Sequence, residues 1–536
     1  DGAVGGNLSI TATTGNITQG VALAVGGTST FITSANEATI ALTTDSNAFT
    51  GALLITTNDA SGADADVTID GGTTGLIMGL STIDGDLALR SGAAITDTGV
   101  ATVGGTLSAT TDASSSAITL DQLAVDGAFT LAPNGNGAVT VVNDAGLNLA
   151  ASTMGGTFSG TATTGDISDS GNLAVTGAAT FITSADGSNI ILDASGNAFS
   201  NAVTMKADTG GNETFGNITF VDSGAVVIQT SADTDADGEL LIDGSTDGAV
   251  GGALSITSKT GDITQGQLLT VTETSTFRTL LSGKDINLNL ANALGGVVTL
   301  TTSGTGGDAT LDNGTTKLDM AASSVGGNLS LRTGHALGII NTSGTIVVGG
   351  NLTLVTDDNS GVINMPNLTV TGSVDLATNG SGNATLVNTR ALEFAASEVG
   401  GDLEATATIG SITQSGALDI EGTSTLLTSE DDADILLANE SNAFTGALLI
   451  TTNGNPDADG LYAAHATIDG GTTALIIGTS TIDGDLTLTS GHNNSTRHAI
   501  TDSGTVTLGG NLSATTDANN GTITLNQLAV TGTIEL

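Results

Sequence analysis

The sequence has no cysteine and no tryptophan, and it has only three prolines and one tyrosine. The lack of cysteine excludes disulfides, which a long repeat protein does not need for stability. Eleven phenylalanines supply nearly all of the aromatic side chains, so the chain has to build a narrow core from aliphatic residues. No apolar run of about 18 residues occurs, so we expect no membrane-spanning helix in this segment.

Positive charge is also scarce. Nine Lys and Arg face 55 Asp and Glu, which gives a net charge of −46. This balance excludes binding to a nucleic-acid phosphate backbone, which needs basic stripes, and it disfavours an anionic membrane surface. It suits a solvated exterior that repels copies of itself, or an exterior that holds divalent cations.

Glycine (77 residues), small polar residues and Val, Ile and Leu make up most of the chain. This mixture favours short strands and turns over helices. A hydrophobic content of 38% argues against disorder despite the charge. Because a single core stops growing at roughly 250–300 residues, the chain is either several domains or one long repeat array.

A fixed spacing selects the array. The stretch Val4–Gly20 returns at Val250–Gly266 and, more loosely, at Met154–Gly171 and Val399–Gly416. In each copy the same positions carry apolar residues, which is how a solenoid appears in sequence. The recurring apolar sets are Leu8, Phe158, Leu254 and Leu403; Ile17, Ile167, Ile263 and Ile412; Leu23, Leu173, Leu269 and Leu418; and Val25, Val175, Val271 and Ile420.

The first coil shows how such a repeat folds. Residues Asn7–Ala12, Asn16–Gln19 and Val21–Val25 alternate apolar and small polar side chains, as half-buried strands do. Glycine-rich corners separate these strands. Strands of successive coils then pair in parallel with right-handed crossovers. The sequence therefore predicts an all-β, right-handed parallel β-helix, or β-solenoid, with coils of about 20–24 residues.

Longer repeats divide this solenoid into modules. The copies of the first stretch predict four of them: residues 1–153, a shortened module at 154–249, then 250–398, and 399–536, which the chain end cuts. We expect one continuous solenoid, because each coil contacts only its neighbours, so a module can lack whole coils while the remaining coils keep the same repeat spacing. Length differences gather in two corners, one of which is 58–67 in the first module and 453–466 in the fourth.

Repeated strings such as Gly5-Gly-Asn-Leu-Ser9, Gly15-Asn-Ile-Thr-Gln19 and Leu23-Ala-Val-Gly26 resemble the β-strand-repeat regions of filamentous-haemagglutinin-like surface adhesins and other giant exported bacterial proteins. The resemblance covers essentially the whole chain at the level of the repeat. It implies a secreted structural segment of an extracellular fibre or adhesin stalk at the cell surface, without catalysis. It also implies cell-surface glycans as partners.

The densest acidic run, 233–239, places Asp at alternate positions before a glycine. That order is the first half of a calcium loop, where glycine permits the sharp turn. The second half departs from the pattern, because the closing acid comes one position early. Two interpretations stay open: a calcium or other divalent-cation site, or solvated acidic turns. The candidate ligands are Asp233, Asp235, Asp237, Glu239 and Asp243.

Other polar residues predict little chemistry. The four histidines lie in variable corners, where we expect exposed loop residues, and the spacing of His492 and His498 does not suit a zinc pair. Paired threonines such as Thr56/Thr57 and Thr301/Thr302 would form outward ladders that bind ice or glycans, although outward Thr is simply a good strand residue. Chance in an Asn- and Thr-rich chain explains most Asn-x-Ser/Thr sequons, such as the one at Asn7.

No catalytic arrangement emerges. A polysaccharide-lyase-like β-helix is the alternative among enzymes, and it needs a Lys or Arg base beside acidic calcium ligands. The basic residues here are dispersed, and Arg90 and Arg332 occupy matching repeat positions. We therefore expect a protein that is not an enzyme and has no cofactor other than calcium.

Both ends of the sequence fall inside the repeat pattern. Residues 1–6 recur at 247–252, and residues 527–532 resemble 122–127. We therefore expect more of the same solenoid at both ends, because a cut solenoid exposes strand edges. Either a longer polypeptide or head-to-tail subunits would supply it.

Overall fold

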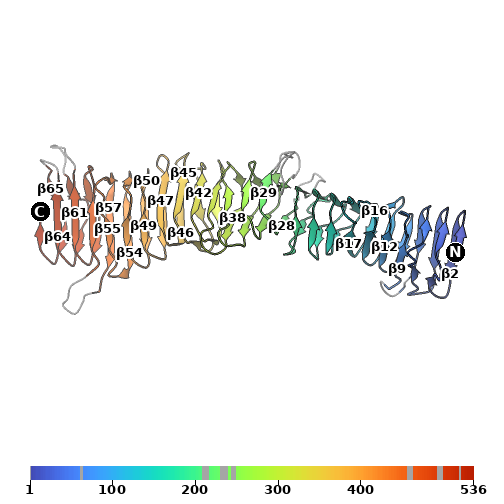
Figure 1. Cartoon of the computed structure of the whole chain (residues 1–536). Helices are drawn as coiled ribbons and strands as arrows, with labels where there is room; N and C mark the ends of the chain where they lie inside the picture. Colours follow the sequence, from blue (N-terminus) through green and yellow to red (C-terminus); the bar gives the residue numbers. More distant parts are fainter. Residues whose placement is uncertain are drawn as a thin grey trace. The chain divides into compact units, whose positions relative to one another are not determined.

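The computed structural model describes residues 2–58, 60, 64–207, 216–229, 239–242, 249–455, 463–491, 499–517 and 521–536. Among these residues every helix or strand is a β-strand. The chain divides into two units, Asp1–Glu273 and Thr274–Leu536, which are described separately. Within each unit, strands of successive turns pair in parallel (Figure 1). The predicted all-β parallel solenoid is therefore confirmed.

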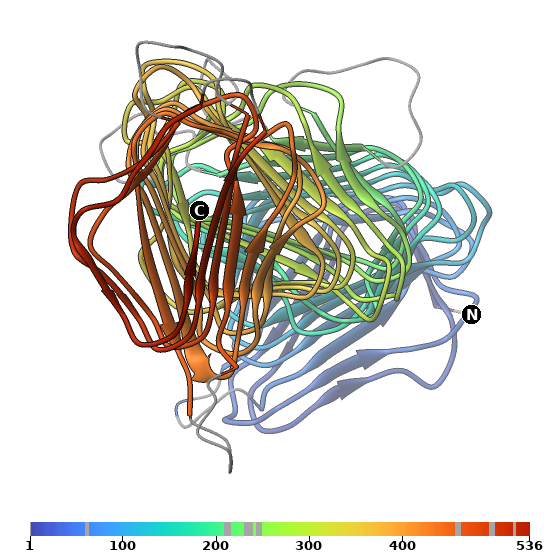
Figure 2. The same cartoon turned by 90° about the vertical axis from the view of Figure 1, so that its left-hand side faces the viewer.

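Each turn has two sides. A long strand forms one side. Two short strands form the opposite side, and in some turns these two are joined into a single continuous strand. Figure 2 shows the last coils of the second unit from their end. In the first unit, β2 pairs residue by residue with β5, from Leu8 opposite Ser29 to Ala12 opposite Thr33. The first coil therefore has the three strands that the sequence predicts, at Leu8–Ala12, Ile17–Thr18 and Leu23–Val25.

The strands of the first unit fall into these two classes. The long strands are β2 (Leu8–Ala12), β5 (Ser29–Thr33), β8 (Leu53–Thr56), β9 (Val67–Asp70), β12 (Leu87–Ser91), β15 (Leu107–Thr111), β17 (Ala128–Ala132), β18 (Val139–Asn143), β21 (Phe158–Ala162), β24 (Ala179–Thr183), β27 (Val203–Lys206), β28 (Ile218–Asp222) and β32 (Leu254–Ser258). The strands of the opposite sides are β1 (Gly2–Val4), β3 (Ile17–Thr18), β4 (Leu23–Val25), β6 (Ile40–Leu42), β7 (Ala48–Phe49), β10 (Leu76–Met78), β11 (Ser81–Ile83), β13 (Ile95–Asp97), β14 (Ala101–Val103), β16 (Ile118–Val125), β19 (Leu147–Leu149), β20 (Ser152–Met154), β22 (Ile167–Asp169), β23 (Leu173–Val175), β25 (Ile190–Leu192), β26 (Ala198–Phe199), β29 (Val226–Gln229), β30 (Glu239–Ile242), β31 (Ala249–Val250), β33 (Ile263–Gln265) and β34 (Thr270–Val271).

The second unit has the same two classes. Its long strands are β35 (Ser275–Thr279), β38 (Val297–Thr302), β39 (Ala309–Asp312), β42 (Leu329–Thr333), β45 (Leu352–Thr356), β47 (Ser373–Thr378), β48 (Ala384–Asn388), β51 (Leu403–Ala407), β54 (Ser424–Asp431), β57 (Ala447–Asn453), β58 (Ala466–Asp469), β61 (Leu486–Ser490), β64 (Leu512–Thr516) and the brief β67 (Ile534–Glu535). The strands of the opposite sides are β36 (Ile286–Leu288), β37 (Ala293–Leu294), β40 (Leu318–Met320), β41 (Ser323–Val325), β43 (Ile339–Asn341), β44 (Ile346–Val348), β46 (Ile363–Val370), β49 (Leu392–Phe394), β50 (Ser397–Val399), β52 (Ile412–Gln414), β53 (Leu418–Ile420), β55 (Ile435–Leu437), β56 (Ala443–Phe444), β59 (Leu475–Ile477), β60 (Ser480–Ile482), β62 (Ile500–Asp502), β63 (Val506–Leu508), β65 (Ile523–Thr524) and β66 (Leu528–Val530).

The strands form blocks that end with a long strand and that, apart from block 1 with its short first strand β1, also begin with one. We number them block 1 (β1–β8), block 2 (β9–β17), block 3 (β18–β27), block 4 (β28–β38), block 5 (β39–β47), block 6 (β48–β57) and block 7 (β58–β67). In blocks 2, 3, 5 and 6, which the structure describes in full, four long strands alternate with three short sets. Such a block therefore contains seven half-turns. The first, third and fourth predicted modules have about the length of two blocks, and the second has about the length of one.

At each block boundary in the first unit the long strands change sides. The long strands of block 1 pair in one ladder, β2 with β5 and β5 with β8. The next long strand, β9, instead pairs with β6 of the opposite ladder, where Thr68 lies opposite Ala41. Block 3 returns its long strands to the first ladder, beginning with β18 beside β16. Block 4 then places β28 beside β25 in the second ladder.

The second unit alternates in the same way. The long strands β39, β42, β45 and β47 of block 5 follow one another in one ladder. β48 opens block 6 in the opposite ladder, beside β46, and β58 opens block 7 back in the first, beside β55. The connection between two consecutive long strands is called a side switch below.

The predicted inward residues form the core. Ile17 and Val25 are buried, as are their copies in later coils, and the copies of Leu8 and Leu23 are buried too. Leu8 and Leu23 themselves are half-buried, because no described strand precedes β2 in its ladder and the residue opposite Leu23 on β1 is Gly2, which has no side chain to cover it. Phenylalanines stack in block 3, with ring centroids of Phe158 and Phe181 5.1 Å apart. The core is narrow and mainly aliphatic, as the composition predicts.

Side-chain rungs reinforce the corners. Asn7 Oδ1 accepts the backbone N–H of Thr28 in the next coil at 3.0 Å. Equivalent rungs follow at successive corners, from Asp166 to Asn189 and from Asn189 to Asn217 in the first unit. In the second unit, Asn328 and Asn351 form consecutive rungs in the same way. We call these stacks corner ladders.

Candidate binding groove

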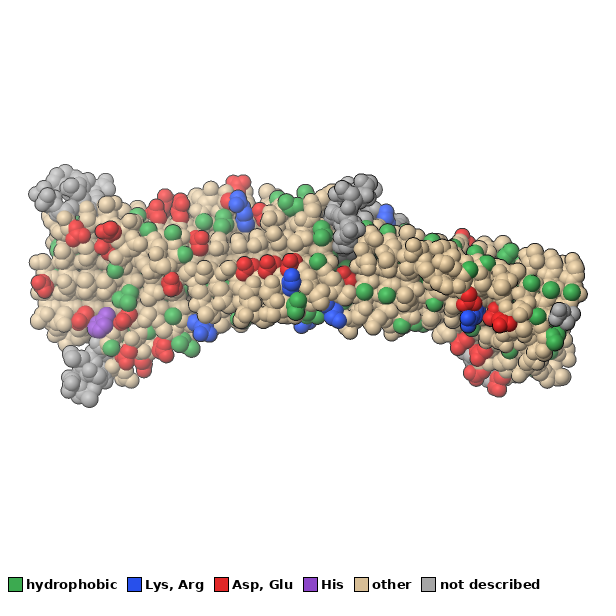
Figure 3. Space-filling view, viewed as in Figure 1, with side chains coloured by type: hydrophobic (Ala, Val, Ile, Leu, Met, Phe, Trp, Pro, Cys, Tyr) green, Lys and Arg blue, Asp and Glu red, His purple; other side chains and the backbone are tan. Residues whose placement is uncertain are grey.

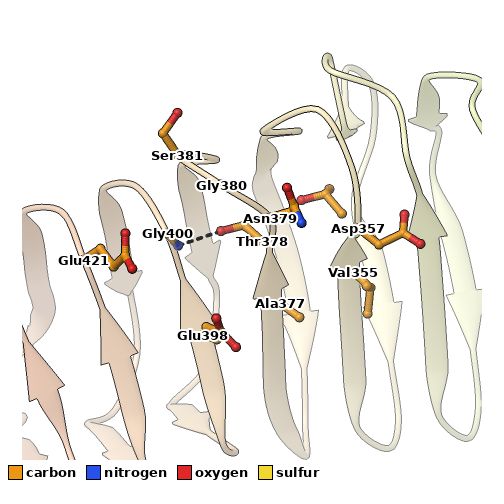
Figure 4. Close-up of a pocket in the computed structure, with 11 residues that line it drawn as sticks. Val355, Asp357, Ala377, Thr378, Asn379, Gly380, Ser381, Glu398, Gly400 and Glu421 are labelled. Atoms are coloured by element: carbon orange, nitrogen blue, oxygen red, sulfur yellow. Dashed lines mark hydrogen bonds between the residues drawn. The ribbon is translucent and has the colours of Figure 1, made fainter.

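A groove of about 510 Å³ opens on the second unit where the long strand β47 gives way to the short pair β49 and β50. β47 contacts β49 through Ser373 and Val374, and β50 through Ala377. The groove lies over this transition and beside the side switch 379–383 (Figure 4). Its polar lining includes Asp357, Thr378, Asn379, Ser381, Glu398 and Glu421.

Thr378 braces the edge of the groove. Its buried hydroxyl donates to the carbonyl oxygen of Gly382 at 2.9 Å and accepts the N–H of Gly400 at 2.9 Å. At the preceding side switch, Thr302 makes the same two bonds, to Gly307 and from Gly326. The threonine that ends a long strand therefore fixes the switch loop to the coil that follows it.

The charges in the groove are acidic. Glu398 lies directly opposite Asp419 on β53, and both side chains are exposed, although like charges in register repel one another. Glu421 lines the same groove, whereas Asp357 forms an ion pair with Arg332. Burial raises the pKa of Asp375, which lies on β47 but is not part of the groove lining. The lining can accept hydrogen bonds from hydroxyl, amine or guanidinium groups.

The residues of the predicted calcium site give no test of that site. Asp233, Asp235, Asp237 and Asp243 lie outside the described residues, and Glu239 belongs to β30 without a described side chain. Within the described part of the chain, no three Asp, Glu or His side chains come together as metal ligands.

Two histidines lie within the described residues, both outside strands as expected, but each is only partly exposed and is bonded to the backbone. His335 is half-buried, and its Nδ1 accepts the N–H of Leu337 at 3.0 Å. His465 is a rung of a corner ladder: its N–H donates to Asp434 and its Nδ1 accepts the N–H of Asp485 at 2.9 Å. His492, His498 and Tyr462 lie outside the described residues.

The paired threonines do not all face outward. Thr57 and Thr302 are buried, and Thr57 Oγ1 accepts the N–H of Asp84 at 3.0 Å. Because successive strand residues face opposite sides, one member of such a pair points inward. The hydroxyl of the inward threonine accepts a hydrogen bond from a backbone N–H of a neighbouring coil.

The sequence analysis missed a set of buried asparagines. Asn47 Oδ1 accepts the N–H of Leu23 at 2.9 Å, while its Nδ2 donates to the carbonyl oxygen of Asp70. Asn442 does the same for Leu418 and Asp469. The signal was visible as the unchanged stretch 46–58 and 441–453, but the partners lie in the coils before and after it.

Two arginines form ion pairs with carboxylates of neighbouring coils. Arg90 Nε binds Asp112 at 2.9 Å, and Arg332 approaches both Asp312 and Asp357. On the face shown in Figure 3, Lys and Arg side chains are isolated and acidic ones recur. Among the described residues, no helix is long and apolar enough to cross a membrane.

Comparison with known families gives one match. The sequence profile described as "Repeats of unknown function (DUF5649)" matches residues 1–56, 64–132, 136–206, 216–301, 306–366 and 381–451. The chain belongs to this family. No curated protein and no solved structure matched it.

The DUF5649 repeat corresponds to a structural block. Breaks between its matched segments fall at the ends of β8, β17, β27 and β38, where the long strands change sides. The next break also covers β47 and ends in the switch before β48. Within each unit, the family repeat is therefore the segment over which long strands stay on one side.

Proposed function

We propose that this chain is a structural, non-catalytic segment of an extracellular bacterial fibre or adhesin stalk. The observation that supports this role is the repetition of one set of bonds from coil to coil, with corner rungs, buried asparagines and switch threonines at equivalent positions. Such nearest-neighbour contacts let a solenoid extend without a new core. A net charge of −46 keeps its surface solvated and repels other copies.

Surface labelling tests this proposal. Intact producing cells should bind antibodies raised against the chain, and external protease should remove the signal while a cytoplasmic marker stays intact. Electron microscopy of the purified chain should show rods. Signal that appears only after the cells are lysed would contradict an extracellular stalk.

The groove favours a second candidate, a glycan-binding or carbohydrate-active surface. Glu398 and Glu421 are exposed carboxylates in one groove, and glycoside hydrolysis uses two carboxylates. Their charge would repel acidic polysaccharides, so neutral glycans are the ligands to test first. Binding or turnover should fall in Glu398→Gln but not in Glu404→Gln, which changes an exposed residue outside the groove. A glycan screen with no binding and no turnover would remove this candidate.

Calcium remains a proposed ligand of the acidic run 233–243. Added calcium should then raise the melting temperature, and Asp235→Asn with Asp237→Asn should remove the effect. If chelation leaves stability unchanged, these turns are only solvated.

A further inference from the structure

Blocks of two kinds follow one another in the chain. In a type A block, the second-to-last long strand begins with a small residue, and the short strands that follow it end with Phe or Leu. In a type B block, these same two positions carry Leu and Val. The type A pairs are Ser29 and Phe49, Ala179 and Phe199, Ser275 and Leu294, and Ser424 and Phe444; the type B pairs are Leu107 and Val125, Leu352 and Val370, and Leu512 and Val530.

This exchange of volume fits close packing, because a larger side chain at one position of a turn accompanies a smaller one at another. Blocks 1 to 7 are therefore of types A, B, A, A, B, A and B. Blocks 3 and 4 are both type A, with no type B block between them.

Block type does not decide the side of the solenoid. In the first unit, the long strands of type A blocks 1 and 3 share one ladder. Block 4 is also type A, yet its β28 and β32 lie in the other ladder, where the type B long strands β9 and β12 lie. Blocks 2 and 4, whose long strands share a ladder, each follow an odd number of blocks, whereas blocks 1 and 3 follow an even number.

We propose that the number of preceding blocks alone sets the side: removing or adding one block moves every later coil of the first unit by half a turn, and a second such change restores the original side. Seven half-turns per block are the reason, since each later coil takes its register from the coil before it. The proposal does not depend on the function suggested above.

Disulfide trapping in this cysteine-free chain tests the native sides first. Partners in register on adjacent strands are close enough to form a disulfide. The pairs Ala41→Cys with Thr68→Cys and Ile191→Cys with Thr219→Cys should therefore link in the full chain. The matched pairs Leu54→Cys with Thr68→Cys and Thr204→Cys with Thr219→Cys should stay at background. Linking of these matched pairs would overturn the side assignment.

Deletion of residues 64–135 then tests the counting rule. It removes block 2 and leaves the connection after β8 at its native length. In this variant Ala41→Cys and Thr140→Cys should link, although Thr140 of the full chain lies opposite Thr119. Linking of Leu54→Cys with Thr140→Cys would show that block 3 keeps its native side, which overturns the rule.

A two-block deletion is the matched control. Without residues 64–215, block 4 should stay on its native side, and Ala41→Cys should link to Thr219→Cys. If the one-block variant loses the β-sheet circular dichroism of the full chain while the two-block variant retains it, a single block is not an exchangeable unit and the proposal fails. If neither variant folds, the proposal fails in the same way.

Discussion

Gln414 and Asn442 lie 28 residues apart in sequence and exchange two hydrogen bonds between neighbouring coils. Gln414 Nε2 donates to Asn442 Oδ1 at 2.8 Å, and Asn442 Nδ2 donates to Gln414 Oε1 at 2.9 Å. Gln19 and Asn47 form the same pair in the first unit, at 2.8 and 3.0 Å. The strings Gly-x-Ile-Thr-Gln and Ser-Asn-Ala-Phe are therefore two halves of one contact.

Asn442→Leu should lower the free energy of unfolding of the second unit by about 2–4 kcal/mol, because it leaves the N–H of Leu418 and the carbonyl oxygen of Asp469 without their side-chain partner in the core. Urea denaturation measures the loss. Gln414→Ala removes the exchanged pair and the bonds of Gln414 to Gly416 and from Asn439, all of them only part-buried, and should cost less, about 1 kcal/mol. Equal losses in the two variants would contradict this account.

Ser29→Ala, Ser275→Ala and Ser424→Ala should each leave stability unchanged or raise it by about 1–2 kcal/mol. The three hydroxyls are buried and have no hydrogen-bond partner, which carries a desolvation cost. Ala179 already occupies the equivalent position in block 3. Thermal denaturation of the single and triple variants gives the sign. A clear loss of stability would mean that the hydroxyls do have partners.

Thr378→Val should destabilise the second unit by about 1–3 kcal/mol, since it removes the bonds to Gly382 and from Gly400 at nearly constant volume. Thr378→Ser keeps the hydroxyl and should retain most of the stability. Hydrogen exchange at the Gly400 amide reports the change locally. Unchanged protection of that amide in the valine variant would exclude the bracing role.

The first unit should become more stable as the pH falls from neutral toward about 4. Burial raises the pKa of Asp222, and also those of Asp97 and Asp169. The unfolded chain, with Asp near 3.9, therefore loses these protons at lower pH than the folded one. Stability is full below the unfolded pKa and declines as the pH rises through the folded values. Urea denaturation at a series of pH values measures this slope.

Asp222→Asn is the matched variant for this slope, because it removes one titrating group from the same place. Its profile of unfolding free energy against pH should be flatter than that of the parent chain, whatever its stability at neutral pH. A parallel profile would show that Asp222 has the same pKa in the folded and unfolded chains.

Thr489→Arg should stabilise the second unit by about 0.3–1 kcal/mol at low salt. Thr489 lies opposite Asp469, as Arg90 lies opposite Asp70 and Arg332 opposite Asp312. The new guanidinium would fill the position that arginine holds in blocks 2 and 5. The gain should disappear at about 1 M salt, where charges are screened. Thr487→Arg, which faces Thr467, should give no such gain.

The structure of a single coil could be predicted from the sequence, because apolar residues mark the buried positions along each strand. Ile17 and its copies alternate with small polar residues, and that alternation alone places them inside. The side switch was not predictable in this way. The long strand β12 of block 2 begins at Leu87 much as β2 begins at Leu8, and nothing in either string shows which ladder it joins.

Hydrogen-bond partners were missed for a related reason. Asn7, Asn328 and Asn351 each begin an Asn-x-Ser/Thr string that was attributed to chance. Each is a corner rung, whose partner is the backbone of a coil 21 to 23 residues later. The groove at Glu398 was missed because its lining comes from several coils and both strand classes. Such contacts depend on the stacking of coils rather than on any local pattern.

The corner ladders also have a polarity. At Asn7, Asp166, Asn328 and Asp402 the earlier coil supplies the acceptor oxygen and the later coil supplies the N–H. A ribosome releases the earlier coil first, so a finished coil presents a template before the next one exists. Each addition then closes a loop of only about one coil, which costs little chain entropy. Folding of this chain is therefore expected to proceed as one-way growth from its first coils, at the pace of synthesis.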